Sequence, residues 1–250
     1  MSTQPHCYLP EGFAAGGEIL LPADESRHLL QSLRLRPGDT VMVFDGCGAA
    51  GAAAVVGTRG GRLVVQVRTV RAVPAPPVSL TLFQALPKGD RMDWIVQKAT
   101  ELGVAAIQPL VTAHVVVRLA AARASGRGVR WGKIAVQAAQ QCRRAWVPRV
   151  LPLQDLAAAA GAVAAYDLFL VASLEAAAVS LRVRLDEMRR GPCRPARVAM
   201  LVGPEGDLTA EEYATLRAAG AQAVSFGATV LRVETAALYG LSVLAYELLP

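Results

Sequence analysis

The sequence is poor in the residues that build metal sites and disulfide frameworks. Its 250 residues include three histidines and four cysteines. The cysteines, at positions 7, 47, 142 and 193, lie far apart and form no CxxC pair. This usage is typical of reduced, packed thiols in the cytoplasm. We therefore predict a cytoplasmic protein without a metal.

Long hydrophobic runs are also missing. The hydrophobic fraction of 53% is inflated by alanine, and Asp167 and Glu175 interrupt the most apolar stretch. No run approaches the roughly 20 apolar residues that a membrane-spanning helix needs. The segment 1–12 lacks the basic region and apolar core of a secretory signal. The sequence therefore predicts no membrane partner.

Common nucleotide-binding and hydrolase motifs are absent, or they match by letter but lack the secondary structure that the motif needs. GCGAAG at 46–51 matches GxGxxG by letter, but a β-patterned segment follows it where a dinucleotide site needs a helix. We interpret it as a hairpin loop. GxxxxGK[ST], a serine elbow and HExxH do not occur. These absences argue against a P-loop nucleotide triphosphatase, a serine hydrolase and a zinc protease.

Acidic residues are absent between Leu102 and Gln154, in a chain of net charge +6. An acid-free stretch of this length needs a counter-charge, and phosphate would supply it. Acids from another part of the fold are the alternative. The charge favours a nucleic-acid partner. The basic residues of the stretch are Arg118, Arg123, Arg127, Arg130, Lys133, Arg143, Arg144 and Arg149, with Trp131 and Trp146 among them.

A proline-rich joint, RAVPAPPVSL at 71–80, divides the chain. Before it, short β-patterned segments alternate with glycine turns, which predicts a small β-barrel. One helix-like insert there, at 24–39, places His28, Arg34 and Arg36 close together. After the joint, strand and helix patterns alternate, which predicts an α/β domain with a mostly parallel sheet. We expect domains at 1–73 and 74–250.

Two glycine loops in the second domain are candidates for a ligand site. LVGPEGDLTAEE at 201–212 follows an apolar strand, and a capping box from Thr209 to Glu212 then opens a helix. SFGATVLRVETAALYG at 225–240 repeats the order of strand, glycine loop and helix. Loops at the carboxyl ends of strands are where open α/β sheets bind ligands. Arg232 and Glu234 stand in an otherwise apolar run, and a structural Arg–Glu pair at a helix start is the alternative explanation for them.

These stretches resemble the ribosomal RNA small subunit methyltransferase E family of the SPOUT class. The motifs that carry the resemblance occur in order along the chain: HLLQSLRLRPGD, KGDRMDWIVQKATELGV, RWGKIAVQAAQQCRR, LVGPEGDLTAEE and VLRVETAAL. The resemblance implies a PUA-like N-terminal barrel, a C-terminal domain with a deep trefoil knot, and a homodimer. It also implies S-adenosylmethionine-dependent methylation of N3 of a uridine in 16S rRNA, in free rRNA or in the small ribosomal subunit.

Site residues follow from matching these motifs. The cofactor loops of the family match Gly203–Gly206, Ser225–Gly227 and Leu231–Ala236. The implied cofactor-binding residues are Leu201, Val202, Gly203, Pro204, Glu205, Gly206, Phe226, Gly227, Leu231, Arg232, Glu234, Thr235 and Ala236. Our candidate RNA-binding residues are His28, Arg34, Lys88, Arg130, Lys133, Gln141, Arg143 and Arg144.

Three residues are candidates for the chemistry. Uridine N3 must lose a proton before it attacks a methyl group, and a cation near the uracil carbonyls would stabilise the resulting anion. Arg232 is our candidate for this cation. Glu205 or Glu234 would accept the proton or orient the base, and the sequence does not choose between them.

The chain departs from the family pattern at several positions. Asp207 stands where the family usually has a second glycine, Gln140 where it commonly has glutamate, and Arg143 where it commonly has glycine. His6 replaces a frequent arginine, and TAHVVV at 112–117 lacks the usual glutamate-arginine-serine pattern. Two other functions stay open: a SPOUT enzyme acting on another RNA base or ribose, and a non-catalytic RNA-binding assembly factor.

Overall fold

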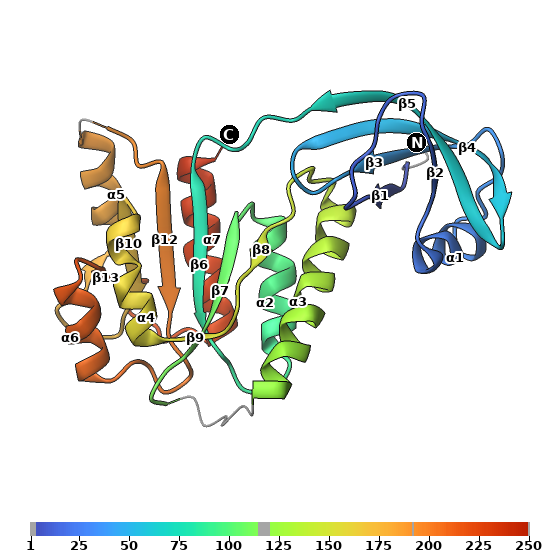
Figure 1. Ribbon diagram of the computed structural model, residues 1–250. Helices are drawn as coiled ribbons and strands as arrows, with labels where there is room; N and C mark the ends of the chain where they lie inside the picture. Colours follow the sequence, from blue (N-terminus) through green and yellow to red (C-terminus); the bar gives the residue numbers. More distant parts are fainter. Residues whose placement is uncertain (1–3, 115–120, 192, 250) are drawn as a thin grey trace. The chain divides into compact units, whose positions relative to one another are not determined.

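The computed structural model describes residues 4–114, 121–191 and 193–249 (Figure 1). The chain divides into two compact units. The first comprises Met1–Ala75 and Val136–Val147, and the second comprises Pro76–Ala135 and Pro148–Pro250. The first unit therefore contains a segment from the middle of the chain, which the sequence analysis did not assign to it.

A five-stranded sheet forms the first unit. The pairing of β1 (His6–Tyr8) with β3 (Thr40–Phe44) is parallel and the other pairings are antiparallel. The hairpin predicted at 46–51 joins two antiparallel neighbours, but its loop ends at Gly48, because Ala49–Gly51 already belong to the second strand. In sheet order the strands are β1 (His6–Tyr8), β3 (Thr40–Phe44), β4 (Ala49–Arg59), β5 (Arg62–Ala72) and β2 (Glu18–Leu20).

Alternating side chains bury one face of this sheet. In β3, for example, Val41 and Val43 are fully buried, and they join a core that also contains Leu29 of helix α1 (Ala23–Gln31). Such alternation is expected for a sheet covered on one face. The end of helix α3 (Ala121–Cys142) belongs to this unit, because Ala139 packs against Phe44 and Ala50.

The second unit is built on a parallel sheet. Every recorded pairing in it is parallel, so the carboxyl ends of its strands lie along one edge. In sheet order the strands are β11 (Val179–Ser180), β13 (Gln222–Ser225), β10 (Leu168–Ala172), β12 (Arg197–Val202), β6 (Ser79–Ala85), β7 (Ala106–Val111) and β8 (Arg149–Val150), and β9 (Gln154–Asp155) also pairs with β7.

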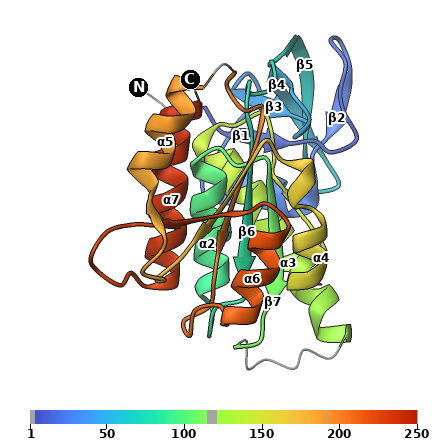
Figure 2. The same cartoon turned by 90° about the vertical axis from the view of Figure 1, so that its left-hand side faces the viewer.

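Helices cover both faces of this sheet. Figure 2 shows α2 (Arg91–Glu101) and α7 (Val233–Leu248) on one face, and α4 (Leu156–Gly161) and α6 (Ala210–Ala218) on the other. The covered strands are continuous apolar runs, as in β12, where every residue after Arg197 is buried. Helix α5 (Leu181–Arg190) is tied to α7 by ion pairing of Arg189 with Glu247, and a short 3₁₀ helix, η1 (Val163–Ala165), follows α4. The predicted alternation of strands and helices is confirmed.

Two further properties concern ligands and membranes. Within the described part of the chain, no three histidine, cysteine or carboxylate side chains gather as metal ligands would. No helix in that part has the length and apolar character needed to cross a membrane.

Candidate active site at the carboxyl edge of the parallel sheet

Four of the loops at the carboxyl edge of the second sheet carry the candidate site residues. They are 86–90 after β6, 112–114 after β7, 203–209 after β12 and 226–232 after β13. The arrowheads of β6 and β12 in Figure 1 point to this edge. Because the strands are parallel, the two glycine loops singled out in the sequence share one edge with two loops that were not.

Arg91 links the two glycine loops. Its Nη1 donates a hydrogen bond of 2.5 Å to Oε1 of Glu205, and its Nε lies 3.7 Å from Oε2 of Glu234. The backbone N–H of Lys88 also donates to Oε1 of Glu205, at 2.9 Å. The guanidinium at the start of α2 therefore pairs with one carboxylate of the first glycine loop and with one in the first turn of α7, directly after the second loop.

The two carboxylates differ in environment. Burial raises the pKa of Glu205, but hydrogen bonds from the Lys88 backbone and from Arg91, with the charge of Arg91, outweigh it, so the pKa is lowered. Glu205 is therefore ionised at neutral pH. Oε2 of Glu234 is buried and has no hydrogen-bond partner among the described residues. A buried acceptor without a donor is costly, so this oxygen is suited to receive a donor from a ligand.

Asp207 takes a backbone conformation that favours glycine. Its φ is +60°, in the left-handed region, where aspartate is among the better tolerated residues after glycine. Its Oδ1 accepts hydrogen bonds from the backbone of Leu208 at 2.8 Å and from the hydroxyl of Tyr213 at 2.7 Å. Burial and the neighbouring Asp207 carboxylate raise the pKa of Tyr213, which stays a donor. The replacement of glycine by aspartate is thus compensated by bonds that glycine cannot make.

His114 lies against the same loop. Its Nδ1 donates to the carbonyl oxygen of Asp207 at 2.8 Å, because that oxygen can only accept. In the neutral ring, Nε2 then carries a lone pair. A Cβ added to Gly206 would approach the His114 ring to 3.3 Å, so the glycine permits this close contact.

The predicted capping box is confirmed at the start of α6. Thr209 Oγ1 accepts from the backbone of Glu212, and Oε2 of Glu212 accepts from the backbone of Thr209 at 2.8 Å. Oε1 of Glu212 also accepts from the backbone N–H of Ala113 at 2.8 Å. One carboxylate thus caps the helix and ties down the loop after β7.

The second glycine loop is open where the first is packed. Gly227 has a φ of +117°, and a Cβ there would meet no atom within 4 Å. Phe226 packs on Tyr239 with ring centroids 5.1 Å apart, and a Cβ at Gly240 would approach Phe226 to 2.9 Å. At Gly203, by contrast, a Cβ would meet Asp207 and Leu208 at 3.4 Å. The open space therefore lies at Gly227.

The remaining predicted cofactor residues differ in exposure. Leu201 and Val202 end β12 and are buried, as are Gly203 and Pro204. Glu205, Gly206, Gly227, Arg232 and Thr235 are exposed, and Phe226, Leu231, Glu234 and Ala236 are half-buried. The exposed members leave polar and backbone groups accessible at this edge.

Arg232 corrects one expectation. The sequence placed it in an apolar run near the core, with an Arg232–Glu234 pair as the structural alternative. Its side chain is exposed at the N-cap of α7, and among the described residues no carboxylate forms an ion pair with it. Glu234 pairs with Arg91 instead. The charge of Arg232 is therefore available to a substrate.

The candidate RNA-binding residues of the second unit are Lys88, Arg130 and Lys133, and all three are exposed. Arg130 forms an ion pair with Asp93, so for this residue a protein acid supplies the counter-charge. Lys88 and Lys133 have no ion-pair partner among the described residues. The side chains of Arg118 and Arg123 lie outside the described part of the structure.

The candidates of the first unit are His28 and Arg34, which are exposed, and three residues around the end of α3. Gln141 and Arg143 are exposed, whereas Arg144 is half-buried, and burial lowers its pKa. Arg143 has a φ of +63° directly after the last residue of the helix. This is the position at which helices commonly carry glycine.

Sequence reasoning missed Arg91 and His114. Arg91 lies inside the quoted KGDRMDW stretch, but its partners Glu205 and Glu234 are distant in sequence. A cation at the start of a helix is unfavourable next to the helix dipole, and this was the available signal. His114 follows a buried strand, which is also a site signal in parallel sheets.

Comparisons with known proteins identify the family. The family model for the RNA methyltransferase domain matches residues 74–245 of the sequence. The family model for the RNA methyltransferase PUA domain matches residues 21–68. Ribosomal RNA small subunit methyltransferase E of Mycobacterium bovis is 33% identical over 235 residues, covering 90% of this chain and 85% of the relative. The enzyme of that name from Bacillus subtilis is 33% identical over 171 residues, covering 68% and 67%.

Solved structures that are similar to this chain include a protein of the same name. A ribosomal RNA small subunit methyltransferase E from Neisseria gonorrhoeae, bound to S-adenosyl methionine, is 33% identical, with a TM-score of 0.84 and 98% coverage of both chains. A protein from Legionella pneumophila, in complex with the bound cofactor SAM, is 29% identical, with a TM-score of 0.86 and the same coverage. The chain belongs to the ribosomal RNA small subunit methyltransferase E family.

Proposed function

We propose that this protein uses S-adenosylmethionine to methylate N3 of a uridine in 16S rRNA. The observation that carries the proposal is the joining of the two glycine loops by Arg91, through Glu205 and Glu234, at the carboxyl edge of the parallel sheet. Family membership supplies the reaction class. S-adenosylmethionine, when bound, supplies an electrophilic methyl group on a sulfonium.

The residues present fit this cofactor. The buried Oε2 of Glu234, without a hydrogen-bond partner among the described residues, suits an N–H or O–H donor of the ligand. The backbone at Gly227 is open to close approach, since no side chain stands there. The half-buried Phe226 and Leu231 supply apolar surface for a flat adenine, whereas Leu201 and Val202 are buried at the end of β12. These loops form our proposed cofactor site.

Arg232 is our proposed catalytic cation. Its exposed guanidinium, beside a cofactor loop, is free to donate to the uracil carbonyls as N3 loses its proton. Such preorganised donors stabilise developing negative charge strongly. Because the Arg232 side chain is exposed, it is not needed for a buried ion pair and can contact the substrate.

The proton acceptor has three candidates. Glu205 and Glu234 were named from the sequence, but both pair with Arg91, and a lowered pKa makes Glu205 a weak base. We favour for these two the role of holding loop geometry. His114 joins them as a candidate, because its bond to Asp207 leaves Nε2 as the acceptor in the neutral ring.

The RNA would lie along exposed basic residues. Lys88 and Lys133 in the second unit, and His28, Arg34 and Arg143 in the first, are exposed. Arg130, paired with Asp93, and half-buried Arg144 are weaker candidates, and Gln141 offers an amide. We propose the 16S rRNA, free or in the small subunit, as the partner of these groups.

The family also suggests finer architecture. We propose that 1–73 and 74–250 are the PUA-like RNA-binding and SPOUT methyltransferase domains, that the first sheet closes as a barrel, and that the cofactor loops form a deep trefoil knot. The position of β13 beyond β10, with α7 returning to pack on α2, supports the knot. We further propose a cytoplasmic homodimer that uses the outer face of α7, where Tyr246 is 87% exposed.

Transfer of a tritiated methyl group tests the proposal. The purified protein is incubated with methyl-tritiated S-adenosylmethionine and small ribosomal subunits from a strain that lacks it. We expect label in 16S rRNA and calorimetric binding of the cofactor. Cofactor binding with label in another RNA would favour a SPOUT enzyme of different target. RNA binding with neither result would favour an assembly factor.

A further inference from the structure

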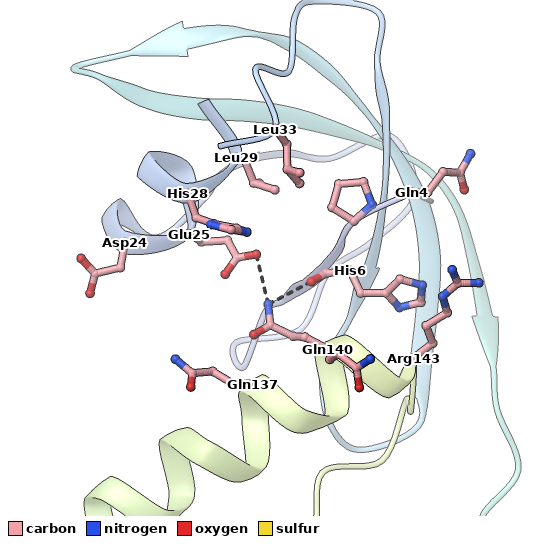
Figure 3. A pocket seen from close by; sticks show the side chains of 12 residues that line it. Gln4, His6, Asp24, Glu25, His28, Leu29, Leu33, Gln137, Gln140 and Arg143 are labelled. Atoms are coloured by element: carbon pink, nitrogen blue, oxygen red, sulfur yellow. Dashed lines mark hydrogen bonds between the residues drawn. The ribbon is translucent and has the colours of Figure 1, made fainter. Parts of the chain in front are cut away.

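A cavity of about 670 Å³ lies in the first unit, away from the glycine loops along the chain. Figure 3 shows α1 on one side of it, His6 of β1 on the other and the end of α3 beneath. Its volume falls within the range of ordinary ligand pockets, roughly 300–1,000 Å³. All of its lining residues belong to the first unit.

A hydrogen-bonded junction fixes one wall of this cavity. Nε2 of Gln140 donates to the carbonyl oxygen of His6 at 2.9 Å and to Oε1 of Glu25 at 3.0 Å, as the dashed lines in Figure 3 mark. Both amide hydrogens are thus used, so the Gln140 side chain offers only its oxygen. With the carboxylate of Glu25, which also lines the cavity, this oxygen makes the wall at the junction a hydrogen-bond acceptor.

The charge of the cavity does not suit a phosphate inside it. Glu25 contributes one negative charge and Arg143 one positive charge, and the Asp24 carboxylate pairs with Arg27, which does not line the cavity. Burial and the charge of Arg143 lower the pKa of His6, so its ring is neutral at physiological pH. An acceptor wall repels phosphate and attracts N–H groups, whereas Arg143, near His6 in Figure 3, offers a phosphate a cation at one side.

A nucleobase has the chemistry that matches these groups. The rings of His6 and His28 and the side chains of Leu29 and Leu33 line the cavity, and bases stack on histidine rings and apolar surface. Guanine fits the acceptor wall best, because its Watson–Crick edge carries N1–H and the N2 amino group side by side. Uracil offers one N–H between two carbonyl oxygens, which carboxylates repel.

We propose that this cavity binds an unpaired guanine nucleotide of the RNA substrate, with the base toward Glu25 and Gln140 and a phosphate at Arg143. It would anchor the RNA at a point other than the methylated uridine. The inference rests on the proposed RNA substrate and deepens it with a second, base-selective site. Sequence-selective recognition of RNA commonly uses such splayed, unpaired bases.

Fluorescence anisotropy with two labelled oligoribonucleotides, UUGUU and UUUUU, tests the proposal. We expect the full-length protein to bind UUGUU at least about fivefold more tightly, the lower end of what one good bidentate base contact supplies. Gln137→Trp, which places a large ring in the cavity from the exposed face of α3, should abolish this preference. Gln31→Trp, an exposed glutamine of α1 outside the cavity, is the matched control and should keep it.

Glu25→Gln gives an independent variant. It keeps the shape of the side chain but replaces one acceptor oxygen with a donor, so the preference for UUGUU should shrink while binding of UUUUU stays or improves. Equal binding of both oligonucleotides by the wild type, or a preference that survives Gln137→Trp in a folded protein, would overturn the proposal. Displacement of UUGUU by an equimolar amount of 5′-GMP would overturn it too, in favour of a free nucleotide as the ligand.

Calorimetry with S-adenosylmethionine separates this inference from the proposed function. The cofactor affinity should be the same in the wild type and in all three variants. A guanine preference in a protein that binds no cofactor would leave the cavity assignment intact and refute the proposed methyltransferase. Cofactor binding without any guanine preference would refute the cavity assignment and leave the proposed methyltransferase intact.

Discussion

At the scale of single residues, Arg232 gives the sharpest test of catalysis. Because its side chain is exposed and no ion pair ties it to a described carboxylate, Arg232→Ala should leave the thermal midpoint nearly unchanged. Single-turnover methyl transfer should slow by about 10²–10³-fold, the usual loss for one oxyanion donor. Arg232→Lys should restore part of the rate, since an ammonium does not reproduce the planar fork. A normal rate for Arg232→Ala would remove the residue from the catalytic site.

Arg143 tests whether an arginine costs stability at a position where the family commonly has glycine. Its φ of +63° directly follows α3, in a region that costs an L-residue roughly 1–2 kcal/mol. Arg143→Gly should therefore raise the free energy of unfolding by about 1 kcal/mol, measured by urea titration. Arg144→Gly is the control, because Arg144 is not among the described residues with positive φ, and it should stabilise nothing. Equal effects of the two changes would contradict the account.

Gln140 shows how such departures fit together. The resembled family commonly has glutamate here, but a carboxylate would face Glu25 and the carbonyl oxygen of His6, both acceptors. The amide of Gln140 donates to both. Asp207 is similar, because its left-handed backbone favours glycine and its bonds to Leu208 and Tyr213 compensate. Neither compensation is visible from the sequence, since the partners of Gln140 lie far away in the chain and Tyr213 reaches Asp207 only once α6 has formed.

At the scale of elements, Glu212 joins the cap of α6 to the loop after β7. Glu212→Ala removes the acceptor of the Thr209 and Ala113 N–H groups. The free energy of unfolding should fall by about 1–2 kcal/mol, since each lost bond contributes about 1 kcal/mol. Glu211→Ala changes the neighbouring exposed acid in the same helical turn and should cost less than about 0.5 kcal/mol. Similar losses of unfolding free energy from both changes would show that the two hydrogen bonds of Glu212 do not stabilise the fold.

Local patterns predicted most of the elements and the two glycine loops. The buried run of β12, the capping box of Thr209 and the hairpin at 46–51 are each set by nearby residues, and all three are confirmed. What local patterns did not predict is long-range pairing. Arg91 contacts Glu205, which lies 114 positions later in the chain, and Glu234, which lies 143 positions later. The end of α3 packs into the first unit. Such contacts depend on strand order, which hydrophobic periodicity does not encode.

At the scale of the whole molecule, the proposed dimer makes a specific demand on α7. Tyr246 is 87% exposed and Tyr239, two turns earlier on the same helix face, is 45% exposed, and a patch of aromatic rings suits an interface between copies. Tyr246→Arg should convert the dimer to a monomer in analytical ultracentrifugation. Leu174→Arg, an apolar residue 60% exposed in the loop after β10, is the control and should leave the dimer intact. A wild-type protein that sediments as a monomer would contradict the proposed assembly.

The most direct test of the central claim is mass spectrometry of nucleosides from methylated 16S rRNA. Small subunits from a strain lacking the protein are incubated with it and with S-adenosylmethionine that carries a deuterated methyl group. We expect one new nucleoside, 3-methyluridine with three deuterium atoms, and its near absence at the same time point with Arg232→Ala. Deuterium on another base or on ribose, or none at all with a folded wild-type protein, would contradict it.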